Sequence, residues 1–272
     1  MKIYLSVDME GISSIVSPNQ ISPGGSEYQR AVKIMTKEVN QVIKAAFDNG
    51  AQEVVVNDAH DAGTNIIAEE LHPYASLIRG QYNPLSMMQG IDETFDAVFL
   101  VGYHARAGTS GAVFDHTYAF RMSDVRINGK PMGEMGINGR VAGYFNVPVA
   151  FVSGDQATIK SAAEELGGPV GVILKNAIGR YAAEILPAKV VEDRLTAGVS
   201  QAMSVLKQLP PTKVEGEVRL EVTFTVAEMA QVCSAIPGCF LKDCRTVAHI
   251  GDDYLAVFKI FLLMLRLSDG IK

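Results

Sequence analysis

Runs of β-branched and aliphatic residues recur along the first part of the chain, and each run ends in polar side chains. The runs are IYLSVDME (3–10), EVVVNDAH (53–60), AVFLVGYH (97–104) and VPVAFVSGD (147–155). Continuous apolar runs of this length are typical of strands that are buried on both faces, as in parallel sheets. They predict four neighbouring strands of a mostly parallel sheet.

Helices are expected between these strands. Ser26 and Gln29 have the spacing of a capping box, and Gly50 suits the position just after a helix. A second helix is predicted over 155–166, directly after the fourth strand. The apolar positions of the first helix recur at helical spacing: Tyr28, Val32, Met35, Val39, Val42, Ile43 and Phe47. The order strand, helix, strand predicts an α/β fold with helices flanking the sheet.

The pair Pro210-Pro211 predicts a boundary, because neither residue fits inside a helix. We expect an α/β catalytic domain over 1–209, whose interval 170–209 we interpret as helical, and a smaller α+β unit over 210–272 that could serve assembly. In that unit, 218–224 alternates apolar and polar residues like a strand with one wet face, and 252–267 reads as a buried or interface helix.

Composition removes several classes of protein. The 272 residues are 48% hydrophobic and 20% charged, which is typical of a globular chain with a real core. The net charge is −6 and no stretch gathers a basic run, so we expect no nucleic-acid partner. Three cysteines without a C-x-x-C pair fit a reducing compartment, and no signal-peptide core precedes Asp8, so a cytoplasmic location is expected. The most apolar stretch, 254–267, is interrupted by Lys259 and Arg266 and is too short to span a membrane.

Acidic and imidazole side chains follow the predicted strands. Asp8 and Glu10 are two residues apart, so both carboxylates project from one face of an extended segment, while His60 and His104 end the next two runs. Glu134 lies between glycines that let the backbone turn sharply. Ligands bind at the carboxyl ends of strands in open α/β sheets, so these five side chains are expected to converge on one rim.

Three carboxylates packed together need a cation, since each would otherwise raise the pKa of the others. The two imidazoles favour a metal of the zinc type, which accepts nitrogen and oxygen ligands. Five ligands exceed the three of a mononuclear catalytic zinc site, and two divalent ions would nearly balance three carboxylates and a bridging hydroxide. The residues therefore predict two zinc ions, with Asp8 as the candidate bridge.

Other polar residues are less specific. His116 lies in a glycine-containing segment that could fold back over the rim, where a histidine could serve as general base, nucleophile or oxyanion partner. For Asp58 a turn or cap role and a functional role both stay open. His72 and His249 are not expected in the site.

Five motifs in one order and spacing resemble the bacterial zinc-dependent D-aminopeptidases, the DppA-like metallopeptidases. The motifs are SVDMEGIS (6–13), VNDAH (56–60), FLVGYHAR (99–106), His116 and GEMGINGRVAGYFNVPV (133–149). The resemblance implies that Asp8, Glu10, His60, His104 and Glu134 bind two zinc ions per subunit and that His116 is the catalytic histidine, described as a nucleophile. It also implies short peptide substrates with an N-terminal D-amino acid, such as D-Ala-D-Ala, and a ring-stacked homodecamer.

The sequence thus predicts a binuclear zinc aminopeptidase in which a metal-bound hydroxide attacks the peptide carbonyl. One alternative is a binuclear amidase or phosphoesterase that uses the same rim. Another is a non-catalytic module that is metal-free or holds metal for structure, although carboxylate-rich sites leave room for water and argue against it.

Overall fold

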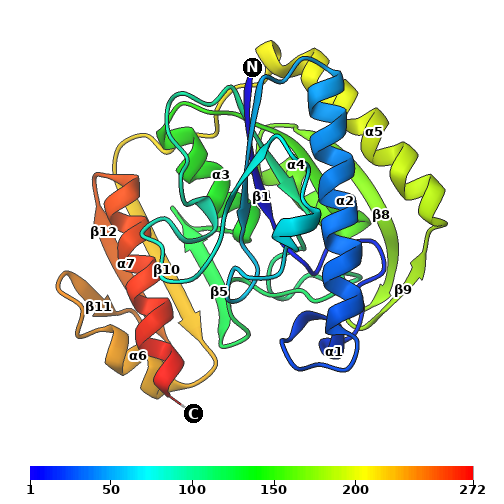
Figure 1. The fold of residues 1–272 in the computed structure, drawn as a ribbon. Helices are drawn as coiled ribbons and strands as arrows, with labels where there is room; N and C mark the ends of the chain where they lie inside the picture. The colour runs from blue at the N-terminus through cyan, green and yellow to red at the C-terminus, as the bar shows by residue number, and fades with distance from the viewer. Residues whose placement is uncertain (272) are drawn as a thin grey trace.

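A mostly parallel seven-stranded sheet forms the centre of the molecule (Figure 1). The computed structural model describes residues 1–271. The strand order is β3-β2-β1-β4-β7-β8-β9, and only the last pair is antiparallel. The strands are β1 (Lys2–Val7), β2 (Glu53–Asp58), β3 (Ala75–Ile78), β4 (Ala97–Val101), β7 (Val149–Asp155), β8 (Val170–Gly179) and β9 (Ala182–Ile185). The predicted fold class and all four predicted strands are confirmed.

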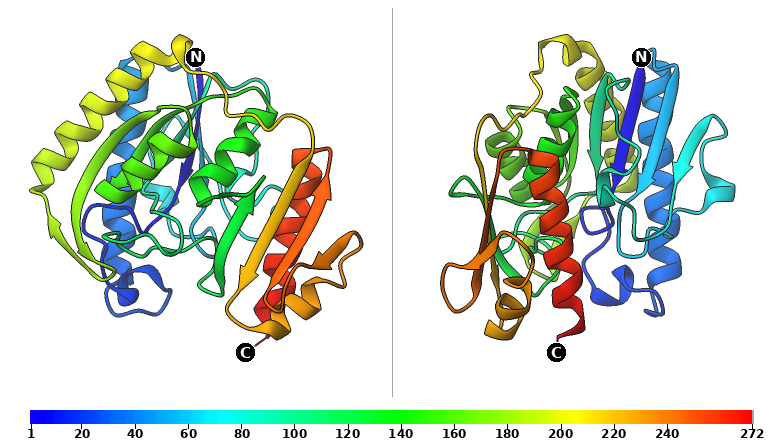
Figure 2. Two further views of the ribbon diagram at one scale, coloured as in Figure 1. Left: turned by 180° about the vertical axis from the view of Figure 1, so that it is seen from behind. Right: turned by 90° about the vertical axis from the view of Figure 1, so that its left-hand side faces the viewer.

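Helices cover both faces of this sheet (Figure 2). Side chains alternate along β1, so that Ile3, Leu5 and Val7 join one core while Tyr4 joins the other. The first core lies under α2 (Tyr28–Asp48) and α5 (Ala188–Val205), and the second under α3 (Glu134–Tyr144) and α4 (Gln156–Glu165). Both faces are therefore dry, which explains the continuous apolar runs of the sequence.

The start of the first predicted helix differs from the expectation. The N-cap of α2 is Glu27, which makes no side-chain capping bond, so the capping box predicted at Ser26 and Gln29 is wrong. A capping box does form at Ser17 and Gln20, around the short α1 (Pro18–Ile21). Ser17 and Gln20 have the same spacing as Ser26 and Gln29, but only Ser17 and Gln20 form the reciprocal hydrogen bonds of a capping box. Gly50, with φ of +93°, follows the end of α2 as predicted.

The prediction that the interval 170–209 is helical is wrong for its first part. It contains β8 and β9 before α5 begins at Ala188. β8 pairs in parallel with β7 and antiparallel with β9 at the edge of the sheet. Lys175 and Asn176 interrupt its apolar run, and β9 is largely exposed, so neither segment shows the continuous pattern of a buried strand.

A smaller antiparallel sheet lies beside the main one, in the order β11-β12-β10-β5-β6. Its strands are β5 (Met122–Ile127), β6 (Lys130–Pro131), β10 (Val218–Phe224), β11 (Cys239–Leu241) and β12 (Thr246–Gly251). Two strands of this sheet, β5 and β6, precede Pro210 in the chain. The division into domains at 209/210 stays a prediction. Two helices pack on it, α6 (Ala227–Cys233) and α7 (Tyr254–Leu267) (Figure 1).

The apolar helix predicted near the end of the chain is α7. It buries Phe258, Phe261 and Met264 in the core shared with the smaller sheet, as expected for a buried helix. Among residues 1–271, no helix combines the length and the apolar character needed to cross a membrane.

The strand order reverses beside β1. Strands β2 and β3 follow β1 on one side, whereas β4, β7 and β8 lie on the other. Loops that leave the carboxyl ends of β1 and β4 consequently diverge and open a crevice, which is where open α/β sheets bind ligands.

Candidate metal centre

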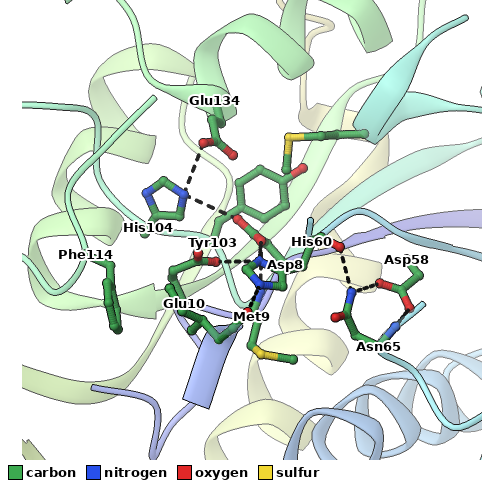
Figure 3. A network of polar contacts seen from close by, with 12 residues as sticks. Asp8, Met9, Glu10, Asp58, His60, Asn65, Tyr103, His104, Phe114 and Glu134 are labelled. Carbon is green, nitrogen blue, oxygen red and sulfur yellow. Dashed lines mark hydrogen bonds and ion pairs between the residues drawn. The ribbon is translucent and has the colours of Figure 1, made fainter. Parts of the chain in front are cut away.

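The structure brings all six predicted site residues together at this crevice. Figure 3 shows the five predicted ligands. Asp8 follows β1 directly, Glu10 lies two residues later, His60 follows β2 and His104 follows β4. Exposure of Asp8, Glu10, His60, His104 and Glu134 is only 1–7%. Three carboxylates and two imidazoles are thus withdrawn from water at one place.

Asp8 lies between the two histidines. Its Oδ1 is 3.2 Å from His60 Nδ1, and its Oδ2 is 3.3 Å from His104 Nε2. His60 Nδ1 also lies 3.0 Å from Glu10 Oε2, and His104 Nε2 lies 3.2 Å from Glu134 Oε1. The two oxygens of one carboxylate therefore face two different clusters, which is the arrangement that a bridging ligand requires.

Hydrogen bonds to main-chain carbonyls fix the histidine tautomers. His60 Nε2 lies 2.7 Å from the Ile21 carbonyl oxygen, and His104 Nδ1 lies 3.0 Å from that of Ala105. A carbonyl oxygen only accepts, so these nitrogens carry the protons. In the neutral rings, His60 Nδ1 and His104 Nε2 are left with bare lone pairs that face carboxylate oxygens. This is how the other ring nitrogen of a metal-binding histidine is usually held.

Two atoms of the centre have no hydrogen-bond partner among the described residues although they are buried, namely Glu10 Oε2 and His104 Nε2. Buried polar atoms are nearly always paired, and a buried charge needs a counter-charge. When both rings are neutral, the oxygen and nitrogen lone pairs converge here without protons between them, and such a set fits one or more divalent cations. The donor set of carboxylates and imidazoles suits zinc.

The electrostatics show how strongly this place attracts positive charge. Burial alone would lower the pKa of the His60 ring, but Glu10 and Asp8 raise it well above its ordinary value. Glu134 and Asp8 likewise overcome burial and raise the pKa of His104. Burial would raise the pKa of Asp8, yet both histidines hold it well below its usual range. A divalent cation would satisfy the same carboxylates while leaving the imidazoles neutral.

Glu134 is presented by a helix rather than by the glycine-rich turn that we expected. It is the first residue of α3, and Gly133 is the N-cap. A Cβ on Gly133 would approach Arg106 Cβ to 3.0 Å, so this glycine lets α3 start close to the segment after His104. Glu134 Oε1 also accepts a hydrogen bond of 2.6 Å from the Tyr118 N–H. The carboxylate therefore has a fixed direction.

His116 stacks on His104, with ring centroids 4.0 Å apart and planes inclined by 7°. Its Nδ1 donates to the Phe114 carbonyl oxygen at 2.8 Å, and its Nε2 lies 3.6 Å from Glu134 Oε1. Ligand-type atoms of His104, His116 and Glu134 lie within 4.8 Å of one another, as do those of Asp8, Glu10 and His104. His116 thus shares the centre, with its Nε2 facing it.

The loop around His116 is held in an unusual shape. Phe114 and Tyr118 have φ of +53° and +59°, a left-handed conformation that costs energy for such side chains. Asp155 accepts from the Val113 N–H, and Asp115 pairs with Arg180, so both flanks of the loop are anchored. The strain is retained because these contacts over-determine the position of His116.

Asp58 does not reach the centre. Its carboxylate accepts hydrogen bonds of 2.6–2.7 Å from Asn65 and from the Ile66 N–H, and Asn65 also donates to the His60 carbonyl oxygen. Asp58 therefore shapes the turn that presents His60, which is the structural alternative left open by the sequence. His72 stacks on Phe47, away from the site, as expected.

A cavity of about 780 Å³ opens over the centre. It extends to the region where α7 ends, a part of the site that no sequence motif indicated. Arg266 lies there with its guanidinium 4.7 Å above the Tyr82 ring, and no carboxylate in residues 1–271 pairs with it. Side chains from distant segments therefore line one space, which only the tertiary fold assembles.

Comparison with known proteins gives consistent matches over the whole chain. Residues 1–263 match the family model for D-aminopeptidase, peptidase family M55. The D-aminopeptidase of Bacillus subtilis (strain 168) is 36% identical over 269 residues, covering 98% of each chain. The solved structure of the Zn-dependent D-aminopeptidase DppA from Bacillus subtilis, a self-compartmentalizing protease, matches with a TM-score of 0.96 and 36% identity over 99% of this chain and 98% of that one.

Proposed function

This chain belongs to the D-aminopeptidase family, as its motifs indicated, and on that premise we propose that it is a zinc-dependent aminopeptidase acting on short peptides with an N-terminal D-amino acid. One observation carries the proposal. Nitrogen and oxygen atoms of the kind that bind zinc converge in a buried cluster beside a cavity, and main-chain carbonyls hold the opposite ring nitrogens of His60 and His104.

Two zinc ions fit the ligand set. His60 and Glu10 would hold one ion, His104 and Glu134 the other, and the two oxygens of Asp8 face both pairs. When bound, paired zinc ions lower the pKa of water and polarise a carbonyl oxygen. The three buried carboxylates would offset three of the four positive charges of two such ions.

His116 is the residue that we assign to proton handling. Its Nδ1 is engaged by the Phe114 carbonyl, so the neutral ring presents a bare Nε2 toward Glu134 and the cavity. Stacking on His104 fixes the plane of the ring. At this position Nε2 can take a proton and return it to the leaving amine, the work of a general acid and base.

The cavity is large enough for a short peptide, and its two ends differ in chemistry. Carboxylates line the metal end, whereas Arg121, Arg266 and Asp269 line the other end. Asp269 pairs with Arg121 there, at 3.0 Å, and Arg266 forms no ion pair among the described residues. A guanidinium is suited to hold a carboxylate by paired hydrogen bonds. We assign Arg266 to the C-terminal carboxylate of a short peptide such as D-Ala-D-Ala.

One set of assays separates this proposal from its alternatives. D-Ala-D-Ala, L-Ala-L-Ala, an amino-acid amide and phenyl phosphate are offered to the same preparation, with and without chelator. We expect chelator-sensitive cleavage of the D-peptide to dominate. Cleavage of the phosphate ester or the amide alone would favour the other binuclear hydrolases, and metal without any turnover would favour a binding module.

The similar solved structure is of a self-compartmentalizing protease, and this supports an oligomeric assembly for the present chain. We infer that this chain forms a closed homo-oligomer, a homodecamer by family resemblance, and that the smaller sheet contributes contacts between subunits. We also infer that the protein is cytoplasmic. Exposed apolar side chains on the β8–β9 hairpin, Ile178, Tyr181 and Ile185, offer a further contact surface. Light scattering during size-exclusion chromatography tests this, since a monomer would contradict it.

A further inference from the structure

The segment that carries Asp8 and Glu10 has no regular structure of its own. We define residues 8–16 as the ligand loop; it follows β1 and precedes α1. Two of its N–H groups bond to the end of β4 and to the residue after it, from Asp8 to the Val101 carbonyl at 2.8 Å and from Gly11 to the Gly102 carbonyl at 2.7 Å. A Cβ on Gly11 would collide with the Tyr103 carbonyl oxygen, so the loop packs closely there.

Three carbonyl groups of the ligand loop converge on one buried amine. The Nζ of Lys175, from β8, donates to the carbonyl oxygens of Glu10 at 2.5 Å, Ile12 at 2.8 Å and Ile15 at 2.6 Å. An ammonium has three donors, and all three are used. Lys175 has no exposed surface, and it forms no ion pair within the part of the chain that the structure describes, although the charges of Asp155, Glu38 and Glu10 act on it from further away.

A buried ammonium without an ion-pair partner is costly unless its hydrogen bonds repay the loss of water. Here the partners are carbonyl dipoles that would repel one another if they pointed at an empty space. Hydrogen bonds from a charged donor are about twice as strong as neutral ones. The amine therefore fixes the relative positions of residues 10, 12 and 15, which lie in a segment without helix or strand.

The same contacts set the direction of Glu10. Its carbonyl faces Lys175, while its carboxylate reaches the other way to His60 Nδ1 at 3.0 Å. Asp8, two residues earlier, faces both histidines. The charge of Lys175 is thus separated from the metal centre by a single residue of backbone.

We propose that Lys175 is a positioning residue that holds the ligand loop, and with it Asp8 and Glu10, in metal-binding geometry before any metal arrives. This inference rests on the zinc site of the proposed function. Preorganisation of this kind improves affinity, because the ordering cost of the loop is met during folding rather than during binding.

The test compares K175M, which removes the donors and keeps the bulk, with L174A. Leu174 is the neighbouring, fully buried residue of β8; it belongs to the same apolar core as Ile12 and Ile15 of the ligand loop, but its side chain has no donor for the loop carbonyls. Both variants are stripped of metal and titrated with zinc against a competing chelator, with circular dichroism and thermal unfolding recorded. We expect K175M to bind zinc at least tenfold more weakly and to lose kcat more than KM, whereas L174A unfolds at lower temperature but binds zinc like the wild type.

Hydrogen exchange of the wild-type protein provides a second readout that does not depend on the folding of K175M. The amides of Gly11, Ile12 and Ile15 should stay protected in the metal-free protein, because Lys175 already holds the loop. Fast exchange of these amides until zinc is added, or equal zinc affinity of K175M and wild type, would overturn the inference. A wild-type protein that binds no zinc at all would instead overturn the proposed function.

Discussion

Replacing Glu38 with glutamine should change how stability depends on pH. Glu38 comes from α2 and is buried, and its carboxylate accepts from the Ser13 hydroxyl at 2.5 Å and the Ser13 N–H at 3.3 Å. It therefore anchors the ligand loop at Ser13. Burial raises its pKa from 4.5 to about 7, although Ser13 and Lys175 oppose the shift.

The direction of the effect follows from the raised pKa. In the unfolded chain Glu38 loses its proton near its ordinary pKa, whereas in the folded protein it keeps the proton until near neutral pH, so unfolding releases a proton between these values. Stability from this group is present at low pH and is lost as the pH rises. With a folded pKa of about 7, the loss between about pH 5 and about pH 8 is about 2.5 kcal/mol.

Urea unfolding of wild type and E38Q at several pH values measures this. A glutamine Oε1 can still accept from Ser13, so E38Q should keep the loop contact and lack the titration. From about pH 5 to about pH 8, the difference between the free energies of unfolding of E38Q and wild type should therefore rise by about 2.5 kcal/mol in favour of E38Q. S13A should shift the wild-type loss to higher pH, because the Ser13 hydrogen bonds lower the pKa of Glu38. Parallel profiles of wild type and E38Q would refute the reasoning.

Further predictions concern the site. H104A and E134A should lose bound zinc and activity together, measured by elemental analysis and peptide turnover, because both side chains face the same cluster. H116A should lower kcat by about 100- to 10,000-fold and leave zinc in place; zinc lost equally from H116A would make His116 a ligand. R266M should raise KM for D-Ala-D-Ala about tenfold or more and leave KM for the D-dipeptide amide unchanged, whereas equal effects on both substrates would refute the assigned carboxylate contact.

Much of the fold could be predicted from the sequence, because both faces of the main sheet are dry. β1, β2, β4 and β7 are continuous apolar runs, and periodicity identifies such strands directly. β8 and β9 were missed because β8 carries Lys175 within its run and β9 lies at an exposed edge. The pairing of β5 with β10 could not be predicted either, because the paired residues are 93 to 102 positions apart and no local pattern encodes such a contact.

The metal-binding side chains of the candidate site could be predicted from the sequence, but the residues that surround them could not. The five candidate ligands follow strand ends or begin a helix, and sequence spacing with the topology of parallel sheets places them at one rim. What lies behind them could not be predicted. Lys175 bonds to carbonyls 160 to 165 positions away, and carbonyls have no side-chain signature. Arg266 reaches the cavity only because α7 packs between the smaller sheet and α3.

Anomalous diffraction at the zinc absorption edge, from crystals grown with zinc, tests the central claim most directly. The account predicts two peaks per subunit, one on each side of Asp8 and about 3.5–4 Å apart, with His60 and Glu10 at one and His104 and Glu134 at the other. A centre without zinc, or a single ion with Asp8 turned away from it, would contradict the account.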